Sequence, residues 1–91
     1  MEKLYQVYVL QNPARRFYIG LSEDVHLRLE QHNLGVSKWT RGRGPWTLAW
    51  TSPVMTLGEA KKMETLLKQQ KGGDGFYRLT GLKKSRALSG S

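Results

Sequence analysis

Two segments near the N-terminus alternate apolar and polar positions with the period of a β-strand. Residues 4–10 (LYQVYVL) place two valines and Tyr5 on one side of the chain. The β-branched and aromatic content of this segment suits a pleated strand better than a helix. Asn12-Pro13 then marks a turn, and residues 16–20 return to the strand pattern. The pattern therefore predicts a β-hairpin.

The predicted register brings two tyrosines to one face of this hairpin. If Leu10 faces Arg16 across the loop, antiparallel pairing places Tyr8 directly opposite Tyr18. As a simple cross-strand aromatic pair, the two rings would stabilise the hairpin by about 0.2–1 kcal/mol. As two phenols pointing the same way, they are also candidates for chemistry.

A first helix is predicted to follow the hairpin. Ser22 suits the N-cap, and the acidic pair Glu23-Asp24 would lie in the first turn, where the helix dipole favours negative charge. The helix should end near residue 33 or 34, with Gly35 as the left-handed residue that stops it. Arg28 and His32, four residues apart, would project from neighbouring points on one side.

A second helix is predicted by a capping box. Thr56 and Glu59 have its spacing, and apolar residues at 57, 60, 63 and 67 recur behind it with helical period. Glu64 falls at the edge of the apolar stripe that must face the sheet, an unexpected place for a carboxylate. After a glycine-rich stop, residues 76–82 could form a short third helix or an extended return.

The loop before the third strand is basic and aromatic. Residues 46–51 alternate in the manner of a strand, and Trp46 and Trp50 are expected in the core. The preceding residues 36–45 suit a flexible loop that forms no core and guides a polyanionic substrate. Trp39 would either stack on an unpaired base or pack beneath the loop as a plug. The candidate nucleic-acid-binding residues are Lys38, Trp39, Arg41 and Arg43.

Length and composition exclude several classes of protein. Ninety-one residues allow one domain, which we place at 1–82, followed by a mobile basic tail at 83–91. The absence of cysteine excludes disulfide frameworks and thiolate metal sites, and the only two histidines, His26 and His32, do not have the spacing of an HExxH motif. The longest apolar run, Val7 to Leu10, is too short to span a membrane, and no signal-peptide pattern is present. We therefore expect a soluble cytoplasmic protein, and the oligomeric state stays open.

The charge of the chain favours a nucleic-acid partner. Fifteen basic residues against seven acidic ones give a formal charge of +8. The basic residues are interleaved with aromatic residues and glycine, and do not line one face of a long amphipathic helix, so a membrane surface is disfavoured. No pattern reads base edges, which predicts recognition of shape or backbone. The alternative is that the charge only keeps the protein soluble.

The ordered motifs of the chain resemble the GIY-YIG nuclease superfamily. That superfamily includes the N-terminal nuclease domain found in excinuclease ABC and small stand-alone proteins of about this size. The resemblance covers most of the chain. Its elements are Gln6-Val7-Tyr8, Tyr18-Ile19-Gly20, residues 27–33, Lys38-Trp39-Thr40-Arg41 leading to Pro45-Trp46, Glu59-Ala60 and Glu64.

The resemblance implies an α/β fold, of the α+β kind, with a small three-stranded antiparallel sheet flanked by helices. It also implies an endonuclease that hydrolyses DNA with a single divalent cation, Mg²⁺ or Mn²⁺, on branched or single-strand-containing substrates, in DNA repair or recombination. RNA is a further candidate substrate. The matching catalytic residues are Tyr8, Tyr18, Arg28, His32 and Glu64, with Glu64 as the metal ligand. Tyr8 would act as base or orient water, with Tyr18 beside it. His32 would be a hydrogen-bonding partner or a relay, and Arg28 would clamp the phosphate.

The chain departs from the family pattern at two points, and several of the matching residues have a structural alternative to catalysis. The first triplet is not literally Gly-Ile-Tyr, and the only asparagines, Asn12 and Asn33, do not match the late asparagine of some members. Arg28 could instead pair with Glu30 or Asp24, His32 could cover a helix end, and Glu64 could pair with Lys68. The alternative functions are a non-catalytic nucleic-acid-binding module and a domain that binds an acidic protein.

Overall fold

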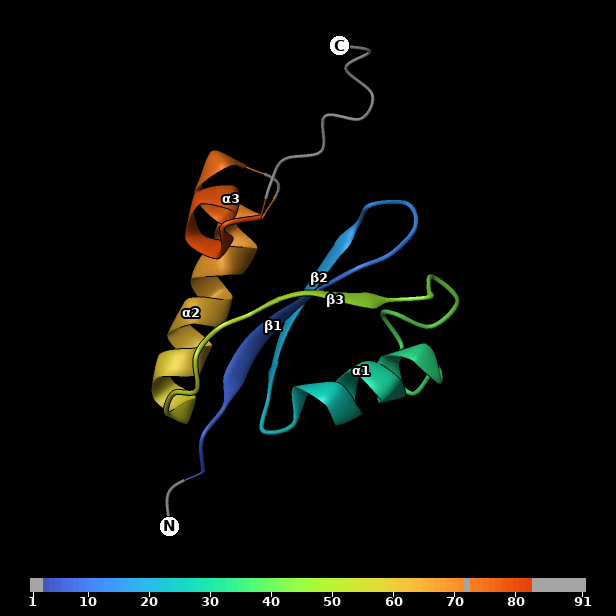
Figure 1. Cartoon of the computed structure of the whole chain (residues 1–91), viewed down its shortest axis with the longest axis horizontal. Coiled ribbons are helices and arrows are strands. Elements are labelled where there is room, and N and C mark those ends of the chain that lie inside the picture. Colours follow the sequence, from blue (N-terminus) through green and yellow to red (C-terminus); the bar gives the residue numbers. More distant parts are fainter. Residues whose placement is uncertain (1–2, 72, 83–91) are drawn as a thin grey trace.

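A small antiparallel sheet forms the centre of the fold, and helices lie on both of its faces (Figure 1). The computed structural model describes residues 3–71 and 73–82. The strand order is β2-β1-β3, and both pairings are antiparallel. The predicted fold class is confirmed. The elements are β1 (Gln6–Gln11), β2 (Phe17–Ser22), α1 (Val25–Asn33), β3 (Thr47–Thr51), α2 (Leu57–Gln70) and α3 (Asp74–Thr80).

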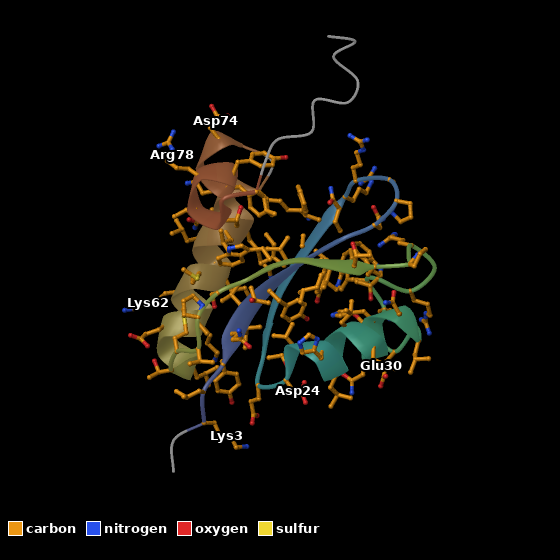
Figure 2. All side chains as sticks on the ribbon, in the orientation of Figure 1. Lys3, Asp24, Glu30, Lys62, Asp74 and Arg78 are labelled. Atoms are coloured by element: carbon orange, nitrogen blue, oxygen red, sulfur yellow. The ribbon has the colours of Figure 1, made fainter. Side chains whose placement is uncertain are left out.

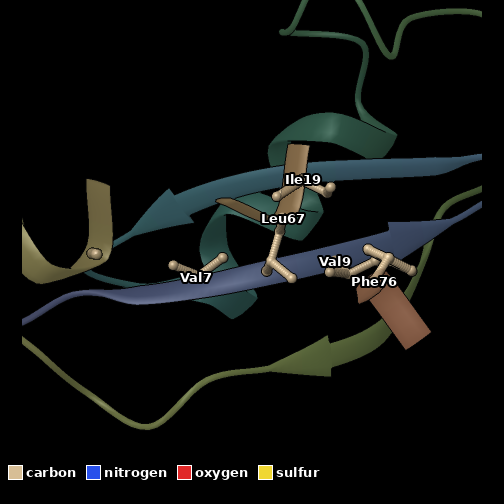
Figure 3. Close-up of a cluster of buried hydrophobic side chains, with 6 residues drawn as sticks. Val7, Val9, Ile19, Leu67 and Phe76 are labelled. Atoms are coloured by element: carbon tan, nitrogen blue, oxygen red, sulfur yellow. The ribbon is translucent and has the colours of Figure 1, made fainter. Parts of the chain in front are cut away.

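The main hydrophobic core lies between the sheet and the helices α2 and α3 (Figure 3). Alternation along the strands sends the valines of β1 and the isoleucine of β2 to this face. Burial of each such side chain stabilises the fold by about 1.5–3 kcal/mol. The core residues, none more than 2% exposed, are Val7, Val9, Ile19, Ala60, Leu67 and Phe76.

The opposite face of the sheet packs against α1. Tyr8 and Leu10 of β1 form a second buried cluster there with Val25 of α1 and Trp46. The prediction that Trp46 belongs to a core is confirmed, and Trp50 packs, partly buried, against the first core cluster. Because side chains alternate along β1, its valines point into the first cluster and Tyr8 points to the opposite face.

The hairpin forms, but its predicted register is wrong by two residues. Leu10 pairs with Tyr18, and Tyr8 pairs with Gly20. The reason is Asn12, whose backbone N–H donates to the Arg16 carbonyl (3.1 Å) and whose Oδ1 accepts from the Arg16 N–H (2.9 Å). These bonds pair Asn12 with Arg16, so the centre of the loop lies at residue 14 and not, as predicted, at residue 13. A shift of two residues leaves every side chain on its predicted face.

The helix ends are partly as predicted. Ser22 is the last residue of β2 and not the N-cap of α1, because Asp24 takes that role and its carboxylate accepts from the Leu27 N–H (3.0 Å). Glu23 and Asp24 therefore precede the first turn. Gly35 has the predicted left-handed conformation, with φ +83°. The capping box at the start of α2 is confirmed. Residues 76–82, for which the sequence allowed either a helix or an extended return, lie mostly in a helix, α3.

The charged side chains labelled in Figure 2 point outward from the fold on several sides.

No helix within the ranges described above is long and apolar enough to cross a membrane. The tail predicted at 83–91 lies outside the described residues.

Candidate active site

The Tyr8 ring lies across the middle of the sheet, on the face that α1 covers. Tyr8 is only 1% exposed, and its partner on β2 is Gly20. A Cβ atom on Gly20 would lie 2.6 Å from the Tyr8 hydroxyl oxygen, so any larger residue would collide with the ring. Glycine at this point of β2 therefore lets the phenol lie close to the backbone.

A chain of buried hydrogen bonds continues from Tyr8 to the loop before β3. The Tyr8 hydroxyl lies 2.9 Å from Nε2 of His32, and Nδ1 of His32 lies 2.8 Å from the Thr40 hydroxyl. The Thr40 hydroxyl donates to the Ser37 carbonyl at 3.5 Å, because a carbonyl can only accept. Thr40 then accepts the Nδ1 proton of His32, and Nε2 accepts the Tyr8 proton. All three side chains that form the chain are 1% exposed.

Tyr18 stands beside this chain of hydrogen bonds. Its ring centre lies 6.3 Å from that of Tyr8 and 4.7 Å from that of His32, edge to face with the imidazole. Trp46 closes the far side of Tyr18 with ring centres 6.4 Å apart, and the indole N–H donates to the Thr40 carbonyl (3.0 Å). The two phenols and the imidazole therefore meet as the sequence predicted, although the strands pair in a different register.

Burial sets the protonation states of Tyr8 and His32. Loss of water around the phenol, with a smaller contribution from Tyr18, raises the pKa of Tyr8 to about 12. Arg28 lowers the Tyr8 pKa through its charge and hydrogen bonding, but burial outweighs it. Burial, aided by the charge of Arg28, lowers the pKa of His32 to about 4. At neutral pH the phenol is protonated and the imidazole is neutral.

Arg28 lies on α1 within reach of the same site. The side chain is partly buried, and its Nη1 donates to Oε1 of Gln31 at 2.9 Å. Within the described part of the chain, no ion pair joins Arg28 to Asp24 or Glu30, so the surface-pair alternative is wrong. The guanidinium instead acts by its charge on both Tyr8 and His32.

Glu64 approaches the site from α2. Its side chain is 22% exposed, and its Oε2 lies 3.3 Å from Nζ of Lys68, so the pairing weighed as an alternative is present. The carboxylate is also close enough to raise the Tyr8 pKa by its charge. Glu64 is therefore not directed only at solvent, and it belongs to the same electrostatic environment as the phenol.

The donor set fits a cation that takes few protein ligands. Among the described residues, no three His, Cys, Asp or Glu side chains come together in a group that could hold a metal. Mg²⁺ is often bound by one or two carboxylates, with waters and substrate phosphate completing its shell. A single carboxylate at Glu64 meets this requirement, and it would not suit a structural zinc site.

Comparison with known proteins gives the family. The model of the GIY-YIG catalytic domain matches residues 4–76. The chain belongs to the GIY-YIG family. This is a nuclease family, so nucleic acid is the class of substrate that membership implies, and divalent metal is the typical cofactor.

This GIY-YIG domain is similar to several UPF0213 proteins. It is 42% identical over 65 residues to one from Aeromonas hydrophila, covering 70% of this chain and 48% of that protein. With a UPF0213 protein of Halobacterium salinarum the identity is 37% over 67 residues, covering 72% and 87%. The chain spans about half the length of the Aeromonas relatives that it matches. No solved structure matches it.

The basic side chains of the loop in this GIY-YIG domain are exposed, but the loop is anchored at Thr40 and at the Arg43 carbonyl. Trp39 is 71% exposed, so the plug alternative is wrong. Arg43 donates through Nη1 to the Trp39 carbonyl (2.6 Å), and Lys38 and Arg41 are also exposed. The expectation that this loop forms no core is wrong at Thr40, which is buried against His32.

Two residues of the site, Thr40 and Gly20, lie within the motifs that carry the family resemblance but were given no role from the sequence alone. Thr40 gave no signal of its own, since one buried polar residue in a basic loop has no periodicity. Gly20 did carry a signal, because glycine inside a strand often marks the close approach of another group. Its role follows only from the observed pairing with Tyr8.

Proposed function

We propose that this protein is a metal-dependent endonuclease that hydrolyses DNA phosphodiester bonds and recognises structure or backbone more than sequence. The observation that carries the proposal is the buried Tyr8–His32 hydrogen bond, with Arg28 and Glu64 acting on the same phenol. The separate cross-strand, helix-capping and ion-pair explanations do not account for this convergence. The strong positive charge of the chain supports an anionic polymer as substrate.

The hydrogen bonds supply a route for the proton of the attacking water. Tyr8 donates its proton to Nε2 of His32, so the phenol oxygen is free to accept one from water. In the proposed step water gives its proton to Tyr8, while Tyr8 passes its own proton to His32. The imidazolium that forms keeps its Nδ1–H on Thr40, which holds the ring in place. This route needs no ionised phenol in the resting protein, which fits the raised Tyr8 pKa.

Arg28 and Glu64 have separate tasks in this proposal. The planar guanidinium of Arg28 suits two oxygens of the scissile phosphate and would stabilise the charge that builds on them. Glu64 would hold the divalent cation, Mg²⁺ or Mn²⁺, which when bound supplies Lewis-acid stabilisation of the departing oxygen. Tyr18 packs on His32 and helps to orient the imidazole.

A non-catalytic nucleic-acid-binding module is the second candidate. The observation that favours it is the ion pair of Glu64 with Lys68, because the ammonium group competes with a cation for the same oxygen. This candidate keeps the fold and the basic surface but predicts no cleavage product. A role in DNA repair or recombination would follow only from the endonuclease activity.

A cleavage assay separates the two candidates. The purified protein, with Mg²⁺ or Mn²⁺, is incubated with duplex, flap, junction and single-stranded DNA. We expect nicking of branched or single-strand-containing substrates, and we expect Glu64→Gln to abolish it while DNA binding persists. Glu30→Gln is the matched control, because Glu30 is an exposed carboxylate on α1 (Figure 2). Cleavage that survives in Glu64→Gln, or no cleavage by the wild type on any substrate, would contradict the endonuclease proposal.

A further inference from the structure

A large open cleft lies next to the site and was not predicted from the sequence. Its volume is about 1360 Å³. One wall is the β1–β2 loop, the second is the loop before β3, and the third is the end of α2 with α3. A hydrogen bond from the Asn12 amide to the Arg43 carbonyl (3.0 Å) holds the first two walls together. Figure 1 shows both loops at the same end of the sheet.

The cleft is lined by cations from all three walls. The lining residues include no carboxylate among the described part of the chain. Burial, with repulsion from Arg16 and Lys68, lowers the pKa of Lys71, so the charged form of Lys71 is disfavoured in the absence of an anion. Such a cluster is stabilised when an anion binds. The cationic residues are Arg15, Arg16, Arg43, Lys68 and Lys71.

Aromatic side chains accompany these cations. Trp39 lines the cleft while 71% of its surface is exposed to solvent, and Tyr77 lines it from α3. Tyr18 also lines the cleft, and its ring touches His32 of the site. Of the five proposed catalytic residues, the cleft therefore reaches Tyr18. Cations beside exposed aromatic rings are the combination by which proteins bind single strands, since phosphates meet the charges and bases stack on the rings.

We infer that this cleft binds an unpaired strand of nucleic acid and directs it toward Tyr18. This inference rests on the proposed function and names the part of the substrate that the protein grips. A stacked base pair hides its faces, so the exposed Trp39 ring favours an unpaired base over a duplex. The volume exceeds the roughly 300–1,000 Å³ of typical small-molecule pockets, which suits several nucleotides and not one small ligand.

The inference redraws the binding surface predicted from the sequence. Of the four predicted residues, Trp39 and Arg43 line the cleft, whereas Lys38 and Arg41 do not. The stem of Arg41 instead lies beside Gly35. The β1–β2 loop and the end of α2 contribute cations that sequence reasoning did not select.

Binding of labelled oligonucleotides tests the inference. Fluorescence anisotropy is measured with the full-length Glu64→Gln protein, so that no substrate is cut, on a 15-nucleotide dT strand, a matching rU strand and a 15-base-pair duplex. We expect the single strands to bind more tightly than the duplex, with the ratio of dT to rU reporting the preference for DNA or RNA. Arg16→Gln with Lys71→Gln should reduce the slope of log affinity against log salt by about 0.7 for each phosphate that the protein no longer neutralises.

Two comparisons make the result specific to the cleft. Lys61→Gln with Lys62→Gln removes the same charge from exposed positions of α2 outside the cleft, and Lys62 points away from it (Figure 2). This control should lower affinity less and leave the slope nearly unchanged. Trp39→Ala should weaken single-strand binding about 5- to 150-fold, the range expected for one stacked base. Circular dichroism of each variant confirms the fold.

The outcomes distinguish this inference from the proposed function. Equal salt slopes in the cleft and control variants, a Trp39→Ala protein with unchanged affinity, or tighter binding of the duplex would each overturn the cleft as the single-strand site. If the wild type still cleaves DNA in that case, the proposed function stands. A protein that neither binds nor cleaves nucleic acid would overturn both.

Discussion

Alanine at position 20 should damage the fold and the site together. Gly20 lies directly across from Tyr8 in the β1–β2 pair. A Cβ atom added there would lie 2.6 Å from the Tyr8 hydroxyl oxygen and 2.7 Å from the adjoining ring carbon. Neither distance is tolerable between nonbonded atoms, so either the ring or the strand must move.

The cost of that movement follows from the burial of Tyr8. The ring is 1% exposed, and its hydroxyl is bonded to His32. Extra volume in a packed site costs about 1–3 kcal/mol. In a domain of this size each kcal/mol lowers the melting temperature by about 4–8 °C. Because the displaced phenol also breaks its hydrogen bond to His32, cleavage should fall further than the loss of folded protein explains.

Thermal unfolding followed by circular dichroism, with nicking rates taken well below the transition, measures both effects. Gly58→Ala is the matched control, because a Cβ at Gly58 on α2 would meet no atom within 4 Å. Alanine is favoured over glycine in helices, so this variant should melt at the wild-type temperature or slightly above it. A Gly20→Ala protein that melts with the wild type would refute the close contact between Tyr8 and the strand.

Two further predictions concern the hydrogen bonds of His32. Thr40→Val should lower the free energy of unfolding by about 1–3 kcal/mol, because it leaves the buried Nδ1–H of His32 without an acceptor, and should slow nicking. Thr40→Ser should restore both, and thermal melts with cleavage rates check this; a Thr40→Ser protein no better than Thr40→Val would contradict the role of the hydroxyl. Acidification from pH 6.5 to 4 should destabilise the protein. His32 in the unfolded chain takes up a proton near its ordinary pKa of 6.5, whereas in the folded protein it stays neutral down to its lowered pKa of about 4. The contribution is at most about 1.4 kcal/mol per pH unit, and urea unfolding of wild type and His32→Gln measures it; identical pH dependence of the two proteins would argue against a buried neutral imidazole.

The alternation of residues allowed the faces of the sheet to be predicted, but not the pairing of the strands. Tyr8 and Tyr18 share a face in every register that differs from the predicted one by an even number of residues. The two rings were therefore placed on one face although the predicted register is wrong. The actual register depends on the Asn12 side chain, which accepts a hydrogen bond within the loop. A turn dipeptide indicates where the chain reverses and does not say which backbone groups the side chain binds.

The parts of the site that escaped prediction depend on tertiary contacts. The place of Glu64 at the edge of the helical stripe and its possible pairing with Lys68 both follow from sequence spacing, but its effect on Tyr8 needed the observed packing. Likewise, the raised Tyr8 pKa reflects burial beneath α1, which no count of nearby basic residues reveals. The cleft joins three segments distant in sequence, so no local pattern could indicate it.

The separation of core and chemistry onto opposite faces of one strand bears on errors in assembly. A slip of β1 by a single residue would turn its valines toward α1 and Tyr8 toward α2. A misaligned molecule would lose its apolar support and its reactive groups in the same event. Proteolysis of loosely folded chains would therefore also remove the conformers in which Tyr8 and His32 no longer meet.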